Sequence, residues 1–150
     1  MPHALYVCLQ DEDKIASFAI DSETGRLTRQ AEVAVPGGPS VLTISSDQRV
    51  LYLGQRTNPA ISSFQIDQNT GALSPQGNVS TEHAPTYLAT DRAGRYLLSA
   101  YYQGGYAAVH PLGAQGAVGA SSVDRQATAS GAHAIDCGAF FQPREREFRK

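Results

Sequence analysis

The sequence predicts an all-β fold assembled from copies of one small sheet, because several kinds of segment return at a fixed spacing of 46 residues. Residues 5–7 (Leu-Tyr-Val) return as 51–53 (Leu-Tyr-Leu), and the turn at 21–27 (DSETGRL) returns as 67–73 (DQNTGAL). The spacing continues into a third copy, where Pro85 matches Pro39. A period of about 40–50 residues with short strands and turn residues is typical of propeller blades. We therefore expect about three four-stranded blades of a β-propeller that is incomplete and unclosed.

One repeat is predicted to hold four short strands. The first strand covers 39–44 and is rich in β-branched and apolar residues, and the second covers 49–54. The third covers 61–66, and the turn at 67–71 then leads to a fourth strand at 72–79. The glycine and Asn/Asp residues of this turn suit the positive φ angles of a hairpin connection. No window has the sustained periodicity of a helix.

The repeat also predicts how the chain is divided. The chain begins on a second-type strand at 4–9, and a later segment, 132–135, matches the opening of a fourth blade. We expect a partial propeller over 1–136, with blade boundaries near 36–38, 82–84 and 129–131. Residues 137–150 leave the pattern abruptly, ending in FFQPREREFRK. A polar tail and a truncated or frame-shifted sequence are the two interpretations, and failure inside a blade favours the second.

Composition and charge exclude several classes of protein. The chain is 41% hydrophobic and 17% charged, which indicates a globular protein rather than a disordered one. Its net charge of −2 gives no basic surface for nucleic acid or a membrane, and no apolar run approaches the ~20 residues of a membrane helix. The N-terminus lacks signal-peptide features, and Cys8 and Cys137 lack metal-ligand spacing. We expect a cytoplasmic chain without a cofactor or metal and without a nucleic-acid or membrane partner.

Five short segments together carry a family resemblance: 49–56 (RVLYLGQR), 61–66 (ISSFQI), 94–96 (GRY), 99–102 (SAYY) and 131–133 (GAH). In these segments the chain resembles the bacterial propeller-type 6-phosphogluconolactonases. The resemblance runs from about residue 4 to residue 135 and corresponds to the N-terminal blades of a seven-bladed family. It implies hydrolysis of 6-phosphogluconolactone to 6-phosphogluconate in the pentose phosphate pathway. The related carboxymuconate cyclases share the fold and act on a different lactone, so fold alone does not choose between them.

Lactone hydrolysis needs a base for water, a group that polarises the carbonyl and a group that holds the phosphate. Histidine suits the first role because its ordinary pKa lies near neutrality, and arginine suits the others because its planar guanidinium stays charged. Neighbouring strands of a blade are antiparallel, so the start of each first-type strand meets the end of the second at one rim. Five candidate residues are expected at this rim: Ser40, Arg56, Thr86, Tyr102 and His133. Gln10 lies 46 residues before Arg56 and is its counterpart in the first blade.

We predict that His133 is the catalytic base and that Arg56 binds the phosphate or polarises the carbonyl. Tyr102, Thr86 and Ser40 are predicted substrate contacts, with Tyr102 donating its hydroxyl to the sugar. The alternatives are structural: a hydrogen-bonded strand histidine, a surface arginine paired with a loop acid, and a packing tyrosine.

Three other features are less informative. His83 is a weaker candidate on the same rim, and His110 stands at the position of Phe64, where we expect it to be half-buried. The acidic run at 11–13 is interpreted as a solvated loop.

Two further outcomes stay open. A non-catalytic propeller with a binding surface is the rival function, although the Trp-Asp and Gly-His signatures of common scaffold repeats are absent and the chain has no Trp. Blades rely on neighbours to bury their faces, so an unclosed set exposes apolar surface. If the chain is a lactonase, we expect its partner to be a small phosphorylated sugar lactone. For the chain alone, we expect inactivity, aggregation or self-association through unclosed blade edges.

Overall fold

The computed structural model describes residues 3–135, which form three antiparallel sheets. The first sheet consists of β1 (His3–Leu9), β2 (Lys14–Ile20) and β3 (Leu27–Ala34). The second consists of β4 (Pro39–Ile44), β5 (Val50–Gln55), β6 (Ala60–Ile66) and β7 (Leu73–Ser80). The third consists of β8 (Tyr87–Thr90), β9 (Tyr96–Tyr101), β10 (Tyr106–Pro111) and β11 (Asp124–Ala127). Two short 3₁₀ turns, η1 (Gln10–Glu12) and η2 (Ala114–Gly116), complete the described elements.

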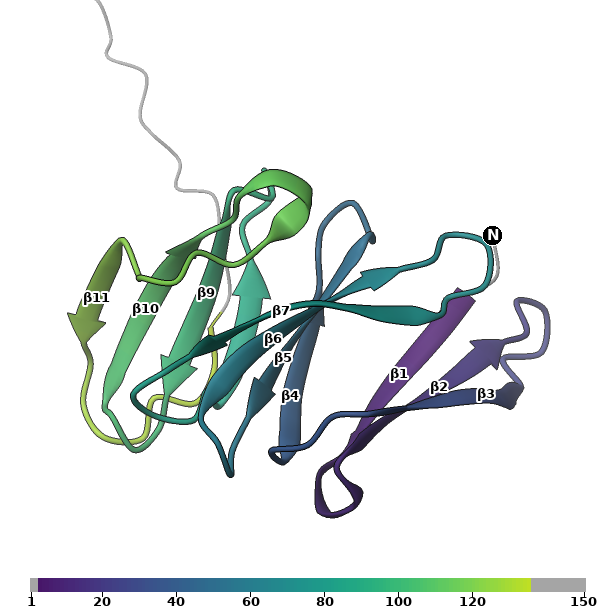
Figure 1. Cartoon of the computed structure of the whole chain (residues 1–150), viewed down its shortest axis with the longest axis horizontal. Coiled ribbons are helices and arrows are strands. Elements are labelled where there is room, and N and C mark those ends of the chain that lie inside the picture. Colours follow the sequence, from purple (N-terminus) through teal and green to yellow (C-terminus); the bar gives the residue numbers. More distant parts are fainter. Residues whose placement is uncertain (1–2, 136–150) are drawn as a thin grey trace, which may run out of the picture.

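The three sheets stand side by side in chain order and do not close into a ring (Figure 1). Within each sheet every strand pairs antiparallel with its neighbour in the sequence. Strand β4 of the second sheet lies next to both β1 and β8, so the three sheets meet along their inner strands. This arrangement confirms the predicted all-β, unclosed propeller. None of the helices within residues 3–135 has the length and apolarity needed to span a bilayer.

The predicted strands agree with the observed ones to within one residue in the second sheet. Strand β4 covers the predicted residues, and β5 and β7 are each shifted by one residue toward the C-terminus. Residues 132–135, which match the opening of a fourth blade, are not part of a strand among the described residues. The division into a propeller part and a tail stays a prediction, since residues 137–150 lie outside the described part of the chain.

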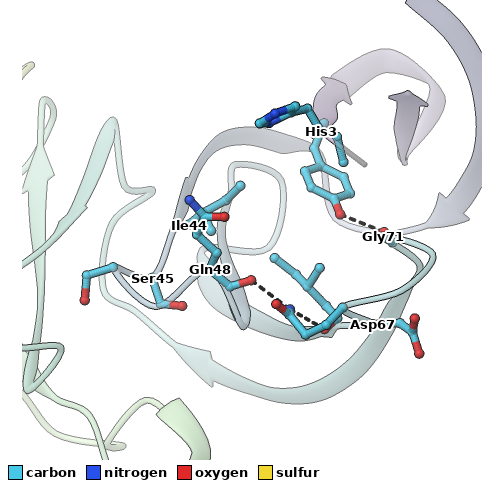
Figure 2. Close-up of a pocket in the computed structure, with 11 residues that line it drawn as sticks. His3, Ile44, Ser45, Gln48, Asp67 and Gly71 are labelled. Carbon is cyan, nitrogen blue, oxygen red and sulfur yellow. Dashed lines mark hydrogen bonds between the residues drawn. The ribbon is translucent and has the colours of Figure 1, made fainter. Parts of the chain in front are cut away.

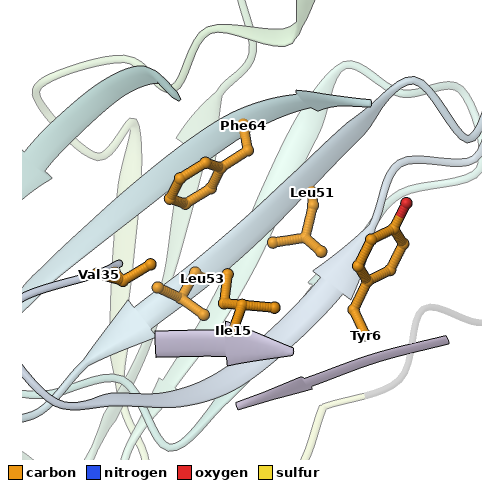
Figure 3. Close-up of a cluster of buried hydrophobic side chains, with 6 residues drawn as sticks. All are labelled: Tyr6, Ile15, Val35, Leu51, Leu53 and Phe64. Carbon is orange, nitrogen blue, oxygen red and sulfur yellow. The ribbon is translucent and has the colours of Figure 1, made fainter. Parts of the chain in front are cut away.

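The first hydrophobic core lies between the first and second sheets. Its six buried side chains come from both sheets and from the link between them, as Figure 3 shows: Tyr6, Ile15, Val35, Leu51, Leu53 and Phe64. Burial of this apolar area, at about 25 cal/mol per Å², is the main force that packs one sheet on the next.

A second core lies between the second and third sheets, and it explains why residues 50–53 of β5 are all apolar. Its members come from the facing sides of the two sheets: Val50, Tyr52, Ile61, Leu88 and Leu97. Because successive residues of a strand point to opposite faces, Leu51 and Leu53 face the first sheet while Val50 and Tyr52 face the third. Every residue of β5 is therefore buried.

Two tyrosines 46 residues apart tie each sheet to the turn of the next one. The Tyr6 hydroxyl donates to the Gly71 carbonyl at 2.7 Å, and the Tyr52 hydroxyl donates to the Gly116 carbonyl at 2.8 Å. Both hydroxyls are held within the protein, so each buried tyrosine satisfies its polar group. The repeated side chain thus makes the same connection at two successive sheet-to-sheet steps.

The close approach of the second and third sheets also depends on a glycine. A Cβ atom at Gly54 would lie 2.7 Å from Val41 Cγ2 and 3.1 Å from the Pro85 ring. Any side chain there would push Pro85 away from β5. Since Pro85 precedes Thr86, this glycine fixes how near the third sheet comes to the rim.

Candidate functional site

The rim pocket contains all five candidate residues predicted from the sequence. It has a volume of about 630 Å³ and is lined by Gln10, Ser40, Val41, Arg56, Ala84, Pro85, Thr86, Tyr102, Gln103 and His133. The strand register explains the gathering, because Val41 near the start of β4 pairs with Gly54 near the end of β5. The same register in the third sheet pairs Tyr87 with Ala100. Side chains from three sheets therefore meet at one end of the molecule.

Arg56 supplies positive charge to this pocket. It follows β5 directly, is exposed, and its backbone N–H donates to the Gly38 carbonyl at 2.9 Å. Among residues 3–135 its guanidinium makes no ion pair, so pairing with a loop acid is not observed there. No Asp or Glu is found among the described residues that line the pocket. The pocket is thus suited to an anionic ligand.

His133 and Tyr102 lie together on the third-sheet side of the pocket. Their rings are edge to face, with centroids 6.3 Å apart and planes at 87°. The His133 segment is held in place because the Gly131 N–H donates to the Tyr102 carbonyl at 3.0 Å. His133 is exposed and outside any strand, so it is not the hydrogen-bonded strand histidine considered above. Both side chains can contact a ligand in the pocket.

The two hydroxyl candidates differ in how far the protein already uses them. The Thr86 Oγ1 atom lies 3.0 Å from the Ala100 carbonyl and 2.9 Å from the Ala132 carbonyl, so its proton is donated within the protein. Thr86 therefore anchors the segment that carries His133. The Ser40 hydroxyl makes only a long contact, 3.4 Å, to the Gly54 carbonyl. Ser40 is the more available of the two donors.

Two residues near the rim were not identified from the sequence. Gln103 lines the pocket and follows Tyr102 as Thr57 follows Arg56, so the 46-residue offset could have suggested it. Asp13 was assigned to a solvated acidic loop, and it is exposed as expected, but the sequence did not indicate that its carboxylate makes a specific contact. Asp13 Oδ1 accepts a hydrogen bond from the Gly38 N–H at 2.8 Å, because a left-handed turn at Asp13 (φ 49°) points the side chain back to the chain.

The other two histidines lie away from the rim pocket. His83 Nδ1 lies 3.4 Å from the Tyr106 hydroxyl, so the side chain faces the third sheet rather than the pocket. His110 is 5% exposed and therefore buried rather than half-buried as expected. Its two ring nitrogens have no hydrogen-bond partner, and burial lowers its pKa, although the Gly119 backbone partly opposes this. Its equivalent in the second sheet, Phe64, is likewise buried, so the same position is part of the interior in both sheets.

A second hollow of about 470 Å³ lies at the opposite end of the second sheet (Figure 2). Its labelled residues come from the start of β1, the end of β4 and the turns of the second sheet: His3, Ile44, Ser45, Gln48, Asp67 and Gly71. The Asp67 carboxylate accepts from the backbone N–H groups of Asn69 and Thr70, which holds its pKa below the usual range. The polar groups here maintain a turn.

Neither a metal centre nor a reactive thiol is found in the described part of the chain. No group of three or more potential metal-ligating side chains occurs within residues 3–135. Cys8 packs against the first core, and burial raises its pKa to about 11, so the thiol stays protonated near neutrality.

Comparison with known proteins gives one family. Residues 3–138 match the family described as "Lactonase, 7-bladed beta-propeller". The chain is 36% identical over 119 residues to the 6-phosphogluconolactonase of Pectobacterium carotovorum and 37% identical over 118 residues to that of Yersinia pestis. These matches cover 79% of the chain but 35% of each relative. The chain thus spans about a third of the length of the curated relatives it matches.

A solved structure supports the same fold. The periplasmic gluconolactonase of Pseudomonas aeruginosa superimposes with a TM-score of 0.77 at 22% identity, over 87% of this chain and 41% of that one. At this level of identity the likeness concerns the fold.

Proposed function

Because the chain belongs to the seven-bladed lactonase β-propeller family, we propose that it takes part in hydrolysis of a sugar lactone, specifically 6-phosphogluconolactone to 6-phosphogluconate in the pentose phosphate pathway. Two relatives that match 79% of the chain carry the name 6-phosphogluconolactonase. The observation that supports this proposal most directly is the rim pocket. Arg56, Tyr102 and His133 lie together there, and no acidic side chain is found among the described residues that line it. Such a pocket favours a phosphorylated lactone over a neutral one.

The proposed reaction uses His133 as the base. Its imidazole takes a proton from water as the water oxygen attacks the lactone carbonyl carbon. Arg56 stabilises the oxyanion that forms, or holds the phosphate, and Tyr102 orients the sugar through its hydroxyl. Collapse of the intermediate breaks the ring C–O bond, and the departing oxygen takes the proton back from His133. The product is the open-chain acid, which loses its proton to solvent.

The experiment measures hydrolysis of freshly generated 6-phosphogluconolactone above the spontaneous rate. Arg56→Ala and His133→Gln are each expected to lower kcat/KM about 100-fold, since each removes one transition-state contact. Arg49→Ala is the matched control, because Arg49 directly precedes β5 whereas Arg56 directly follows it, and it should keep wild-type activity. Equal rates for wild type and Arg56→Ala would remove Arg56 from the site.

A binding function is the outcome if no catalysis is measured. In that case 6-phosphogluconate should still bind to the wild-type chain and bind more weakly to Arg56→Ala, because the basic pocket does not depend on turnover. A neutral lactone or a muconolactone that reacts faster than the phosphorylated sugar would instead favour the cyclase-type substrate. We place the reaction in the cytoplasm, where phosphorylated sugars are metabolised.

The outward faces of the first and third sheets support self-association of the isolated chain. Leu5 and Val7 are each 36% exposed on the first sheet, and Tyr87 is 40% exposed on the third. Each face matches, at the 46-residue spacing, a face that packs on a neighbouring sheet within the chain. We propose that two copies join through these faces, and sedimentation over a concentration series tests this. A monomer at every concentration would contradict it.

A further inference from the structure

The linker 35–38 joins the first and second sheets and runs beside the backbone of Arg56. Gln55 at the end of β5 and the two residues that follow it each donate a hydrogen bond to one carbonyl of this linker. Gln55 Nε2 donates to the Pro36 carbonyl at 2.7 Å, the Arg56 N–H to Gly38 at 2.9 Å and the Thr57 N–H to Gly37 at 3.0 Å. The position of the Arg56 backbone therefore depends on the position of this linker.

Asp13 holds the same linker from the other side. Its backbone carbonyl accepts from the Val35 N–H at 2.7 Å, and its carboxylate accepts from the Gly38 N–H at 2.8 Å. A carboxylate that accepts a backbone N–H makes a charge-assisted bond, which is stronger than a neutral one. The chain of contacts runs from Asp13 through Gly38 to Arg56, and it connects the first sheet to the rim pocket.

The linker has no room to move toward β5. A Cβ atom at Gly37 would lie 2.6 Å from Gln55 Nε2, and Gly37 has φ of 116°, which other residues rarely adopt. The close approach lets the Gln55 amide reach the Pro36 carbonyl. Both sides of the linker are thus fixed by side chains.

The equivalent place between the second and third sheets lacks the carboxylate. Pro59 stands 46 residues after Asp13, and its carbonyl accepts from the Thr81 N–H at 3.0 Å, as that of Asp13 does from Val35. Proline has no side-chain acceptor, so this second connection is made by backbone alone. The additional bond occurs next to the one blade whose second strand ends in arginine.

We propose that Asp13 is a positioning residue for Arg56, acting through Gly38, in the binding of a phosphorylated sugar acid. The inference rests on the proposed function. Asp13 keeps the Arg56 backbone in place, and the guanidinium then meets the ligand without a further ordering cost. The carboxylate acts by accepting the Gly38 hydrogen bond, so an uncharged acceptor in its place preserves the effect.

The experiment measures the Kd of 6-phosphogluconate for the 150-residue chain and its variants. Asp13→Gly removes the acceptor while suiting the left-handed backbone, and it should weaken binding about fivefold, the size of one hydrogen bond. Asp13→Asn keeps an oxygen acceptor and tolerates this backbone, and it should bind within about twofold of wild type. Asp11→Ala removes a neighbouring acidic charge and should also stay within about twofold.

A double-mutant cycle separates positioning from other effects. In an Arg56→Ala background Asp13→Gly should cause no further loss, because there is no guanidinium left to position. An Asp13→Asn protein as weak as Asp13→Gly, or additive losses in the double variant, would overturn the proposal. Amide hydrogen exchange gives a second readout that needs no ligand: the Arg56 N–H should exchange about tenfold faster in Asp13→Gly but not in Asp13→Asn.

The two proposals can fail separately. If Arg56→Ala binds like wild type, Arg56 is not part of the site and the proposed function fails there. If Arg56→Ala loses binding while Asp13→Gly does not, only the positioning role is overturned. If exchange at Arg56 is unchanged in Asp13→Gly, the linker does not hold the arginine, whatever the binding data show.

Discussion

The second and third sheets carry the same strand pattern 46 residues apart, yet they stabilise the same position by different chemistry. In the second sheet the end of β5 holds Gln55, which is 5% exposed and sits within a polar cluster. Ser62 Oγ and Asn78 Nδ2 both donate to Gln55 Oε1, at 2.7 and 2.9 Å, and the Gln55 amide donates to the Pro36 carbonyl. Gln55 and Ser62 are buried while Asn78 lies at the exposed edge, and each of these polar groups has a partner.

In the third sheet the equivalents are aromatic and apolar. Tyr101 replaces Gln55, Ala108 replaces Ser62, and Tyr106 replaces Ala60. The rings of Tyr101 and Tyr106 stack with centroids 4.4 Å apart, and the guanidinium of Arg125 lies 3.5 Å from the Tyr106 centroid. Arg125 also pairs with Glu82 at 2.7 Å. Desolvation raises the pKa of Tyr101 to about 12, so its hydroxyl stays protonated.

The difference teaches that the repeat specifies the backbone and the alternation of faces, while the interior of each sheet can be filled in more than one way. An amide cluster depends on satisfying every donor and acceptor, whereas an aromatic stack depends on area and shape. The amide cluster is also joined to the linker beside Arg56. The polar cluster is therefore found in the sheet whose backbone carries Arg56.

The largest expected effect comes from removing the aromatic stack. Tyr106→Ala should lower the free energy of unfolding by about 3–5 kcal/mol, because it empties a buried aromatic volume. Tyr106→Phe is the matched control, since it keeps the ring and loses only the hydroxyl, and it should cost less than about 1 kcal/mol. Urea titration measures both. A loss below about 1 kcal/mol for the alanine variant would show that the stack is not a core element.

The next largest effect is expected in the amide cluster. Gln55→Ala removes the acceptor of the buried Ser62 hydroxyl and the donor to the Pro36 carbonyl, and it should cost about 2–3 kcal/mol, the usual range for unsatisfied buried groups. Gln65→Ala is the comparison, because Gln65 makes an exposed hydrogen bond to the Gln115 carbonyl, and it should cost less than about 0.5 kcal/mol. Similar losses for the two variants would mean that the buried cluster has no special weight.

The smallest effect sharpens the comparison at one position of β6 and β10. His110→Phe places in the third sheet the residue that the second sheet has at Phe64, and it should stabilise by about 1 kcal/mol, since it removes unpaired ring nitrogens. Thermal melts near neutral pH measure the change. A destabilised variant would show that the site cannot accept the phenyl ring.

The same variant should also change the response to acid. Burial lowers the pKa of His110 in the folded state, so the unfolded chain, with an ordinary histidine pKa of about 6.5, binds the proton first. Wild type therefore loses stability as pH falls below about 6.5 toward the lowered folded pKa, and His110→Phe should lose less over this window. Parallel stability curves for the two proteins would contradict this assignment.

The repeated features of the fold could be predicted from the sequence, and the features that occur once could not. The strand positions of the second sheet and the meeting of Arg56, Tyr102 and His133 follow from the 46-residue offset and antiparallel pairing. The side-chain contacts of Asp13 and Gln55 have no counterpart, because Pro59 and Tyr101 occupy the equivalent positions, so no repetition marks them. The burial of His110 was underestimated because a polar residue at an apolar position gives no sign of how tightly its neighbours close over it.

The tyrosine bonds between successive sheets have a consequence for the angle at which each sheet meets the next. Tyr6 and Tyr52 act as spacers of one length, with hydroxyl-to-carbonyl distances of 2.7 and 2.8 Å. A shorter side chain at either step would change the angle between those two sheets, so each angle is set locally by its own tyrosine contact.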